Sequence, residues 1–158
     1  MRKYDLKYLR LSFQVAHKAR LHGNHPFGAV LVDENGSLLM EAENTVNTGR
    51  DCTAHAETNL VRQASHQYQA DFLSRCTLSA STEPCPMCAG AIYWANICRV
   101  VFGLSEAALY DLVEQDSEEK LLLPCQEVFS RGGKAMEVLG PLLEVEATQA
   151  HLGFWSGN

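Results

Sequence analysis

The sequence predicts an α/β fold in which a central sheet is flanked by helices. Two observations carry this prediction. Short apolar runs bounded by turn residues alternate along the chain with segments of helical periodicity, and no repeat or interdomain linker interrupts the pattern. A chain of 158 residues buries roughly two-thirds of the surface that its unfolded form exposes. We therefore expect a single domain over residues 1–158.

The first half of the chain predicts a helix, a hairpin and a second helix. Apolar residues recur at three- and four-residue intervals over 4–20, which is typical of an amphipathic helix. Apolar strands over 27–32 and 37–43 flank Asp33–Gly36, whose Asn-Gly pair favours a tight hairpin turn. A polar, loop-like segment follows, and helical spacing returns over 53–67.

The second half continues the alternation of strands and helices. The predicted elements are a strand over 76–81, a helix over 87–95, a strand over 99–103, a helix over 105–113 and an extended segment over 136–147. Pro86 suits the first position of the helix that it precedes, because its missing N–H is not needed there. Residues 114–135 match no element clearly.

Composition and charge narrow the class of function. The net charge is −6, with only 13 Lys and Arg, which disfavours a nucleic-acid partner and favours a small substrate. Charged residues near the start interrupt any signal-peptide core, and no apolar run is long enough to span a membrane. We expect a cytoplasmic protein whose six cysteines are reduced.

The stretch Thr82–Ala91 (T-E-P-C-P-M-C-A-G-A) carries the main chemical signal. Cys85 and Cys88, on the first turn of a helix, direct their sulfurs the same way and are suited to a zinc ion. The chain has no second C-x-x-C, but His55 offers a third ligand. Three ligands leave one position open, as in catalytic rather than structural zinc sites. A structural zinc or a redox dithiol is the alternative interpretation.

Glu57 is the candidate catalytic residue. On a continuous helix it would diverge from His55 by about 200°, so it need not bind the metal. At a helix start it could instead reach a water at the open position and transfer its proton.

The residues His55-Ala56-Glu57 and Pro84–Cys88 together form the H-x-E…P-C-x-x-C signature of zinc deaminases. On these motifs the chain resembles the cytidine/deoxycytidylate deaminase-like superfamily, and Glu83–Ala95 looks most like the bacterial guanine deaminases. The resemblance implies a three-layer α/β/α fold with a central mixed sheet and one Zn²⁺ per subunit. It also implies a homodimer whose C-terminal tail, about 148–158, helps to close an active site, its own or the partner's.

The resemblance further implies a set of substrate contacts. Asn44 would hydrogen-bond the base, and Asp116, by ungapped spacing, would contact a purine. The other implied contacts are Phe27, Ala56, Trp94 and Trp155. From the residues alone, Asp116 lies in an acidic run typical of a solvated face, and the aromatic residues fit a core as well as a pocket.

The implied activity is hydrolytic deamination of a nucleobase, with guanine to xanthine and ammonia as the first expectation. The alternatives are a tRNA-specific adenosine deaminase, a deaminase of another aminated heterocycle (cytosine, ammeline or a nucleoside) and a non-catalytic zinc-binding module. Cys52 stands where relatives often have proline, and the tail lacks the terminal tyrosine associated with guanine deaminases. Both departures concern the substrate and not the metal.

Overall fold

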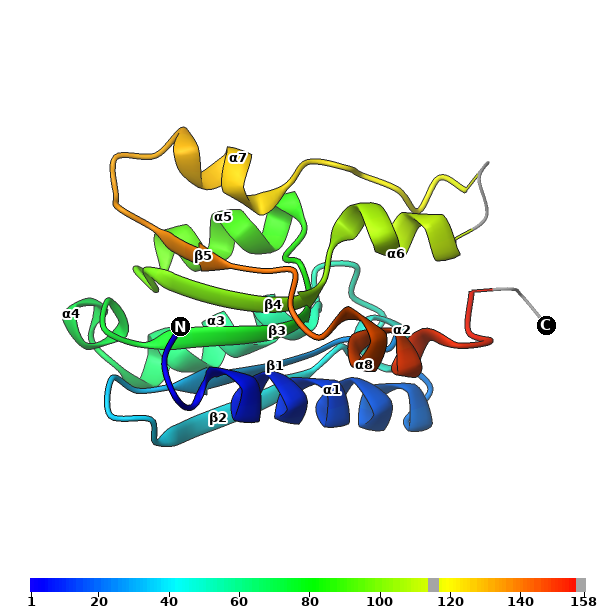
Figure 1. Ribbon diagram of the computed structural model, residues 1–158, viewed down its shortest axis with the longest axis horizontal. Helices are drawn as coiled ribbons and strands as arrows, with labels where there is room; N and C mark the ends of the chain where they lie inside the picture. Colours follow the sequence, from blue (N-terminus) through cyan, green and yellow to red (C-terminus); the bar gives the residue numbers. More distant parts are fainter. Residues whose placement is uncertain (114–116, 156–158) are drawn as a thin grey trace.

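The computed structural model describes residues 1–113 and 117–155 (Figure 1). A five-stranded mixed sheet runs through its centre in the order β2-β1-β3-β4-β5. The strands are β1 (Gly28–Val32), β2 (Leu38–Glu43), β3 (Thr77–Thr82), β4 (Arg99–Leu104) and β5 (Glu137–Leu139). Strand β1 pairs antiparallel with both β2 and β3, whereas β3, β4 and β5 pair parallel.

Helices and one 3₁₀ turn connect the strands. They are α1 (Asp5–Leu21), α2 (Val46–Gly49), α3 (Ala56–Gln67), α4 (Ala70–Leu73), α5 (Pro86–Trp94), α6 (Glu106–Leu112), α7 (Cys125–Ser130), α8 (Glu144–Thr148) and η1 (Gln149–His151). Within residues 1–113 and 117–155, none of these helices is long and apolar enough to cross a membrane.

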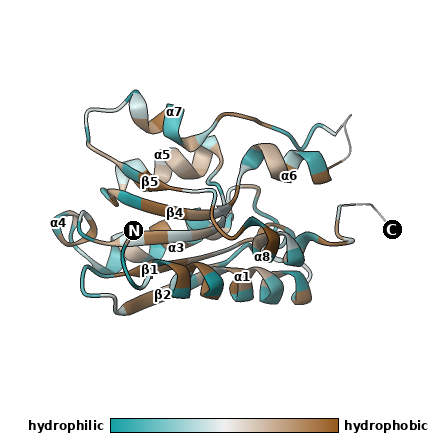
Figure 2. Cartoon of the chain, viewed as in Figure 1, coloured by the Kyte–Doolittle hydropathy of each residue, from teal (hydrophilic) through white to brown (hydrophobic). Residues whose placement is uncertain are grey.

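The two faces of the sheet are covered by different helices. Along β1, Ala29 and Leu31 join the core beneath α3, α5 and α7, whereas Val30 and Val32 pack toward α1. Figure 2 shows the corresponding amphipathic pattern on α1, whose ribbon alternates between hydrophobic and hydrophilic residues. The alternation along β1 has a period of two, so apolar side chains point to both faces of the sheet and helices cover both. The predicted three-layer α/β/α fold with a mixed sheet is confirmed.

A buried ion pair ties the first helix to the sheet. Arg99 at the start of β4 donates from Nη1 and Nη2 to the two carboxylate oxygens of Asp5, each at 2.7 Å. The Arg99 side chain is 4% exposed and that of Asp5 is 0% exposed. Since a charge buried without its partner is costly, this pair requires both residues.

Two of the sequence-based boundaries were wrong. Helix α3 begins at Ala56 and not at Thr53, because a turn closes from the Ala54 N–H to the Asp51 carbonyl and leaves His55 extended. The segment 136–147 is extended only over Glu137–Leu139 and then continues into α8. The unassigned segment contains α7.

Candidate active site

The topology gathers loops from four strands at one edge of the sheet. The parallel strands β3 and β4 end together, at Thr82 and Leu104. Because β1 runs antiparallel to β3, its start lies at the same edge, next to the end of β2. The chain therefore presents Phe27 before β1, Asn44 after β2 and the segment around Cys85 after β3 on one side of the molecule. This is the edge at which open α/β sheets bind ligands.

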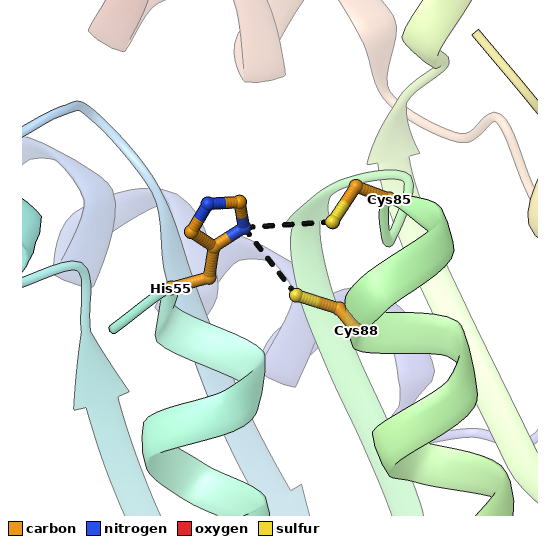
Figure 3. A group of neighbouring side chains, drawn as sticks. All are labelled: His55, Cys85 and Cys88. Carbon is orange, nitrogen blue, oxygen red and sulfur yellow. Dashed lines mark hydrogen bonds between the residues drawn. The ribbon is translucent and has the colours of Figure 1, made fainter. Parts of the chain in front are cut away.

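His55, Cys85 and Cys88 meet at this edge (Figure 3). The Nδ1 atom of His55 lies 3.5 Å from the Cys85 sulfur and 3.4 Å from the Cys88 sulfur. In a tetrahedral site with ordinary Zn–N and Zn–S lengths, a nitrogen and a sulfur ligand stand about 3.6 Å apart. The three side chains are thus spaced as zinc ligands, and the set could hold a metal ion.

Two helix starts supply these three side chains. Cys85 is the N-cap of α5 and Cys88 lies in its first turn, while His55 is the N-cap of α3. The positive ends of both helix dipoles therefore face the site and favour negative charge on the sulfurs. A hydrogen bond from the Cys88 thiol, with a further one from His55, lowers the pKa of Cys85 to about 4.

Glu57 lies in the first turn of α3, next to the predicted ligands. Because His55 precedes the helix in an extended conformation, the divergence of about 200° expected on a continuous helix does not apply. Both residues line the same cavity. The Glu57 residue is 5% exposed, and burial raises the pKa of its carboxyl to about 7, an effect that the neighbouring Cys88 thiol partly opposes. A carboxyl with a pKa near neutrality is suited to accept and return a proton.

A cavity of about 400 Å³ opens beside this cluster. Of the residues predicted to contact substrate, Phe27, Asn44 and Trp155 line it, and so does His25. The Asn44 Oδ1 accepts the Val46 N–H at 3.0 Å, which directs the amide so that its Nδ2 is the group left to donate. The volume is within the range of small-molecule sites.

Trp155, near the C-terminus, lines the cavity of its own chain. The Trp155 indole N–H donates to Nδ1 of His151 at 2.9 Å, and the two rings stack. Phe27 contacts both rings, and His25 packs against Trp155. These aromatic contacts fix the position of Trp155 at the cavity wall. The predicted role of the tail in closing an active site stays a prediction.

Two other predicted substrate contacts, Trp94 and Ala56, do not line the cavity. Trp94 is a correction: it is 80% exposed, because α5 carries it about 12 Å along the helix axis from the cysteine end. It packs instead near the Lys134 ammonium. Ala56 is buried in the hydrophobic core between α3 and the sheet. Asp116 lies outside the described residues.

Three acidic residues of the cavity, Glu83, Glu106 and Glu119, were not among the predicted site residues. Glu83 accepts the N–H groups of Glu106 and Cys125, each at 3.0 Å, and so connects the starts of α6 and α7. Glu106, the first residue of α6, is 2% exposed and lines the cavity. Only the position of Glu83, at the end of a predicted strand and two residues before Cys85, could have drawn attention to it.

Comparisons with known proteins agree with this geometry. Residues 2–104 match the family model "Cytidine and deoxycytidylate deaminase zinc-binding region". A probable cytosine deaminase of Schizosaccharomyces pombe is 43% identical over 155 residues, 98% of this chain and 94% of that protein. The guanine deaminase of Bacillus subtilis is 38% identical over 107 residues, 61% of this chain and 68% of that protein.

The fold is also found among solved structures. A structure from a study of A-to-I editing by tRNA:A34 deaminases superposes with a TM-score of 0.72 at 28% identity, covering 92% of this chain and 99% of the other. The family model spans both the His55 helix start and the Cys85–Cys88 turn. The chain therefore belongs to the cytidine and deoxycytidylate deaminase zinc-binding family.

Proposed function

We propose that this chain is a zinc-dependent hydrolytic deaminase of a small aminated nucleobase, with cytosine as the first candidate substrate. One observation carries the proposal: a His/Cys/Cys cluster spaced for zinc lies at a cavity that is also lined by a buried carboxyl, Glu57, which is not needed as a ligand. A site with three protein ligands, an open position and a proton carrier is built for hydrolysis. A module that only binds zinc does not need Glu57 there.

The donor set of His55, Cys85 and Cys88 fits zinc in residue type and spacing. Bound there, zinc would supply a Lewis acid and lower the pKa of a water at the remaining position toward about 7. We propose one ion per subunit.

The remaining chemistry belongs to the protein. Glu57 takes one proton from the attacking water as the new C–O bond forms and gives it to the ring nitrogen. It then takes the second proton from the added hydroxyl group and gives it to the leaving amine, so that the C–N bond breaks and ammonia departs. Asn44, whose Nδ2 is left to donate, holds a carbonyl or ring nitrogen of the base. Phe27 and Trp155 offer aromatic faces to the heterocycle and exclude bulk water.

The choice of base rests on the extent of similarity. The similarity to the probable cytosine deaminase covers 98% of the chain, including most of the C-terminal tail, whereas the similarity to the guanine deaminase covers 61%. Guanine, the first expectation from the Glu83–Ala95 motif, is the second candidate. Acidic side chains on the cavity wall and the net charge of −6 disfavour an RNA substrate.

Ammonia release from zinc-loaded protein tests the proposal. The panel contains cytosine, cytidine, guanine, adenine, ammeline and an adenosine-containing anticodon stem-loop. We expect activity on cytosine or guanine that disappears in Glu57→Gln while the zinc content stays the same. Inosine formation in the RNA without activity on any free base would contradict the proposal. Sedimentation of the same sample tests the proposed homodimer.

A further inference from the structure

Glu106 stands out among the cavity residues because its carboxyl group is buried and unpaired. The residue is 2% exposed, and neither carboxyl oxygen has a hydrogen-bond partner among the residues that the structure describes. Buried polar side chains are almost always hydrogen-bonded, since leaving one unpaired costs stability. Glu106 lines the cavity, although each of its carboxyl oxygens exposes less than 1 Å². A ligand in the cavity would therefore reach this unpaired group after a rotation of the side chain.

The neighbouring Glu83 is also buried, but unlike those of Glu106, its carboxylate oxygens are both hydrogen-bonded. Both carboxylate oxygens of Glu83 accept backbone N–H groups, those of Glu106 and Cys125. The fold therefore pairs one buried carboxylate fully and leaves the other unpaired, side by side at the same wall of the cavity. The burial of Glu83 is explained by its hydrogen bonds to the starts of α6 and α7. No such hydrogen bond of the described residues explains the burial of the Glu106 carboxyl group.

The surroundings of Glu106 favour its uncharged form. Burial, together with the nearby Glu83 carboxylate, raises the pKa of Glu106 to about 8. The backbone N–H of Leu123 partly opposes this rise in pKa. A protonated carboxyl offers one O–H donor beside one carbonyl acceptor. Such a pair is complementary to a ring N–H that stands next to a ring C=O, the lactam edge of a heterocycle.

We propose, on the basis of the proposed function, that Glu106 is a specificity-determining residue that binds the lactam edge of the substrate. Its O–H donates to the ring carbonyl, and its second oxygen accepts the adjacent ring N–H. Cytosine has this edge at N1–H and C2=O, and guanine has it at N1–H and C6=O. Adenine lacks the carbonyl, and cytidine lacks the N–H because the sugar occupies N1. The preferred substrate class is therefore a lactam base. For the pyrimidine this means the free base and not the nucleoside, whereas guanosine, with its sugar on N9, keeps the lactam edge of guanine.

The test compares cytosine with 4-aminopyrimidine, which keeps the amine but has no lactam edge, using zinc-loaded wild type, Glu106→Leu and Glu106→Gln. We expect Glu106→Leu to reduce the cytosine to 4-aminopyrimidine ratio of kcat/KM by about 10- to 100-fold, the effect of one or two lost hydrogen bonds. Glu106→Gln keeps a donor beside an acceptor and should retain the ratio within about threefold. If guanine is the substrate, 2-aminopurine replaces 4-aminopyrimidine.

Thermal unfolding separates binding from a structural role. Glu106→Leu removes an unpaired buried carboxyl, so its Tm should equal or exceed that of the wild type. The matched variant Glu83→Leu leaves two N–H groups without acceptors and should lower the Tm. An unchanged substrate ratio in Glu106→Leu, a loss in Glu106→Gln as large as in Glu106→Leu, or a fall in Tm like that of Glu83→Leu would overturn the inference. Failure of the proposed function is distinct, since the wild type itself would then deaminate no base.

Discussion

Acidification from pH 7 to pH 5 is expected to destabilise the folded chain through His151. This side chain is 2% exposed, and its Nδ1 accepts the indole N–H of Trp155 at 2.9 Å. Protonation would place a second N–H against the indole N–H and break this hydrogen bond. Burial, with the nearby Arg20 and His17, accordingly lowers the pKa of His151 to about 4, from an ordinary value of 6.5.

The sign and size of the effect follow from proton linkage. Because the unfolded chain takes up the proton at a higher pH than the folded chain, stability is complete above about pH 6.5 and falls as the pH approaches 4. Each pH unit inside this window costs about 1.4 kcal/mol, so the free energy of unfolding should fall by about 2 kcal/mol between pH 7 and pH 5. Asp5, whose pKa is lowered by the hydrogen bond to Arg99 against the opposing effect of burial, contributes only at lower pH.

Urea unfolding at pH 7 and pH 5, followed by tryptophan fluorescence in a Trp94→Phe background, measures this difference with Trp155 as the sole reporter. The control is His151→Gln, whose side-chain oxygen can still accept the indole N–H but does not titrate in this range. Both proteins share any effect of acid on the metal ligands. We expect the control to lose about 2 kcal/mol less than the wild type. Parallel pH profiles for the two proteins would refute the assignment to His151.

Three further predictions concern the metal site, the proton carrier and the buried ion pair. Cys88→Ser should lose stoichiometric zinc by elemental analysis, and a chelator should lower the Tm of the wild type but not of this variant. Glu57→Gln should keep its zinc but lose at least about 100-fold in kcat; activity within tenfold of wild type would exclude proton transfer by Glu57. Arg99→Met should cost about 3–5 kcal/mol in urea unfolding, because Asp5 stays buried without its partner. Asp5→Asn added to Arg99→Met should recover part of this loss, and no recovery would contradict the ion-pair explanation.

The three candidate metal ligands could be predicted from the sequence because zinc sites use particular residue types at short spacings. Cys85 and Cys88 lie three residues apart at one helix start, and His55 precedes another. These relations are local, and local geometry follows from helix periodicity and capping. The fold class was predictable for a similar reason, since strands buried on both faces are apolar and helices are amphipathic.

The pairing of the acidic residues in the cavity wall depends on contacts between distant elements. Glu83 and Glu106 follow different strands, and only the parallel pairing of β3 with β4 places them side by side. Trp94 was misplaced because its motif neighbours say nothing about how far α5 carries it from the site.

The sequence by itself therefore determined an α/β class and a candidate His/Cys/Cys ligand set with Glu57 beside it, because these rest on residue type and on short spacings at two helix starts. The three-layer arrangement was implied by the resemblance to zinc deaminases. Only the tertiary structure decided where the tail of Trp155 is seated and which buried carboxyl, Glu106, has no protein partner. The physical reason is that pairing of strands and packing of the chain end join residues far apart in sequence. Whether a buried polar atom has a partner can be known only when all its neighbours are in place.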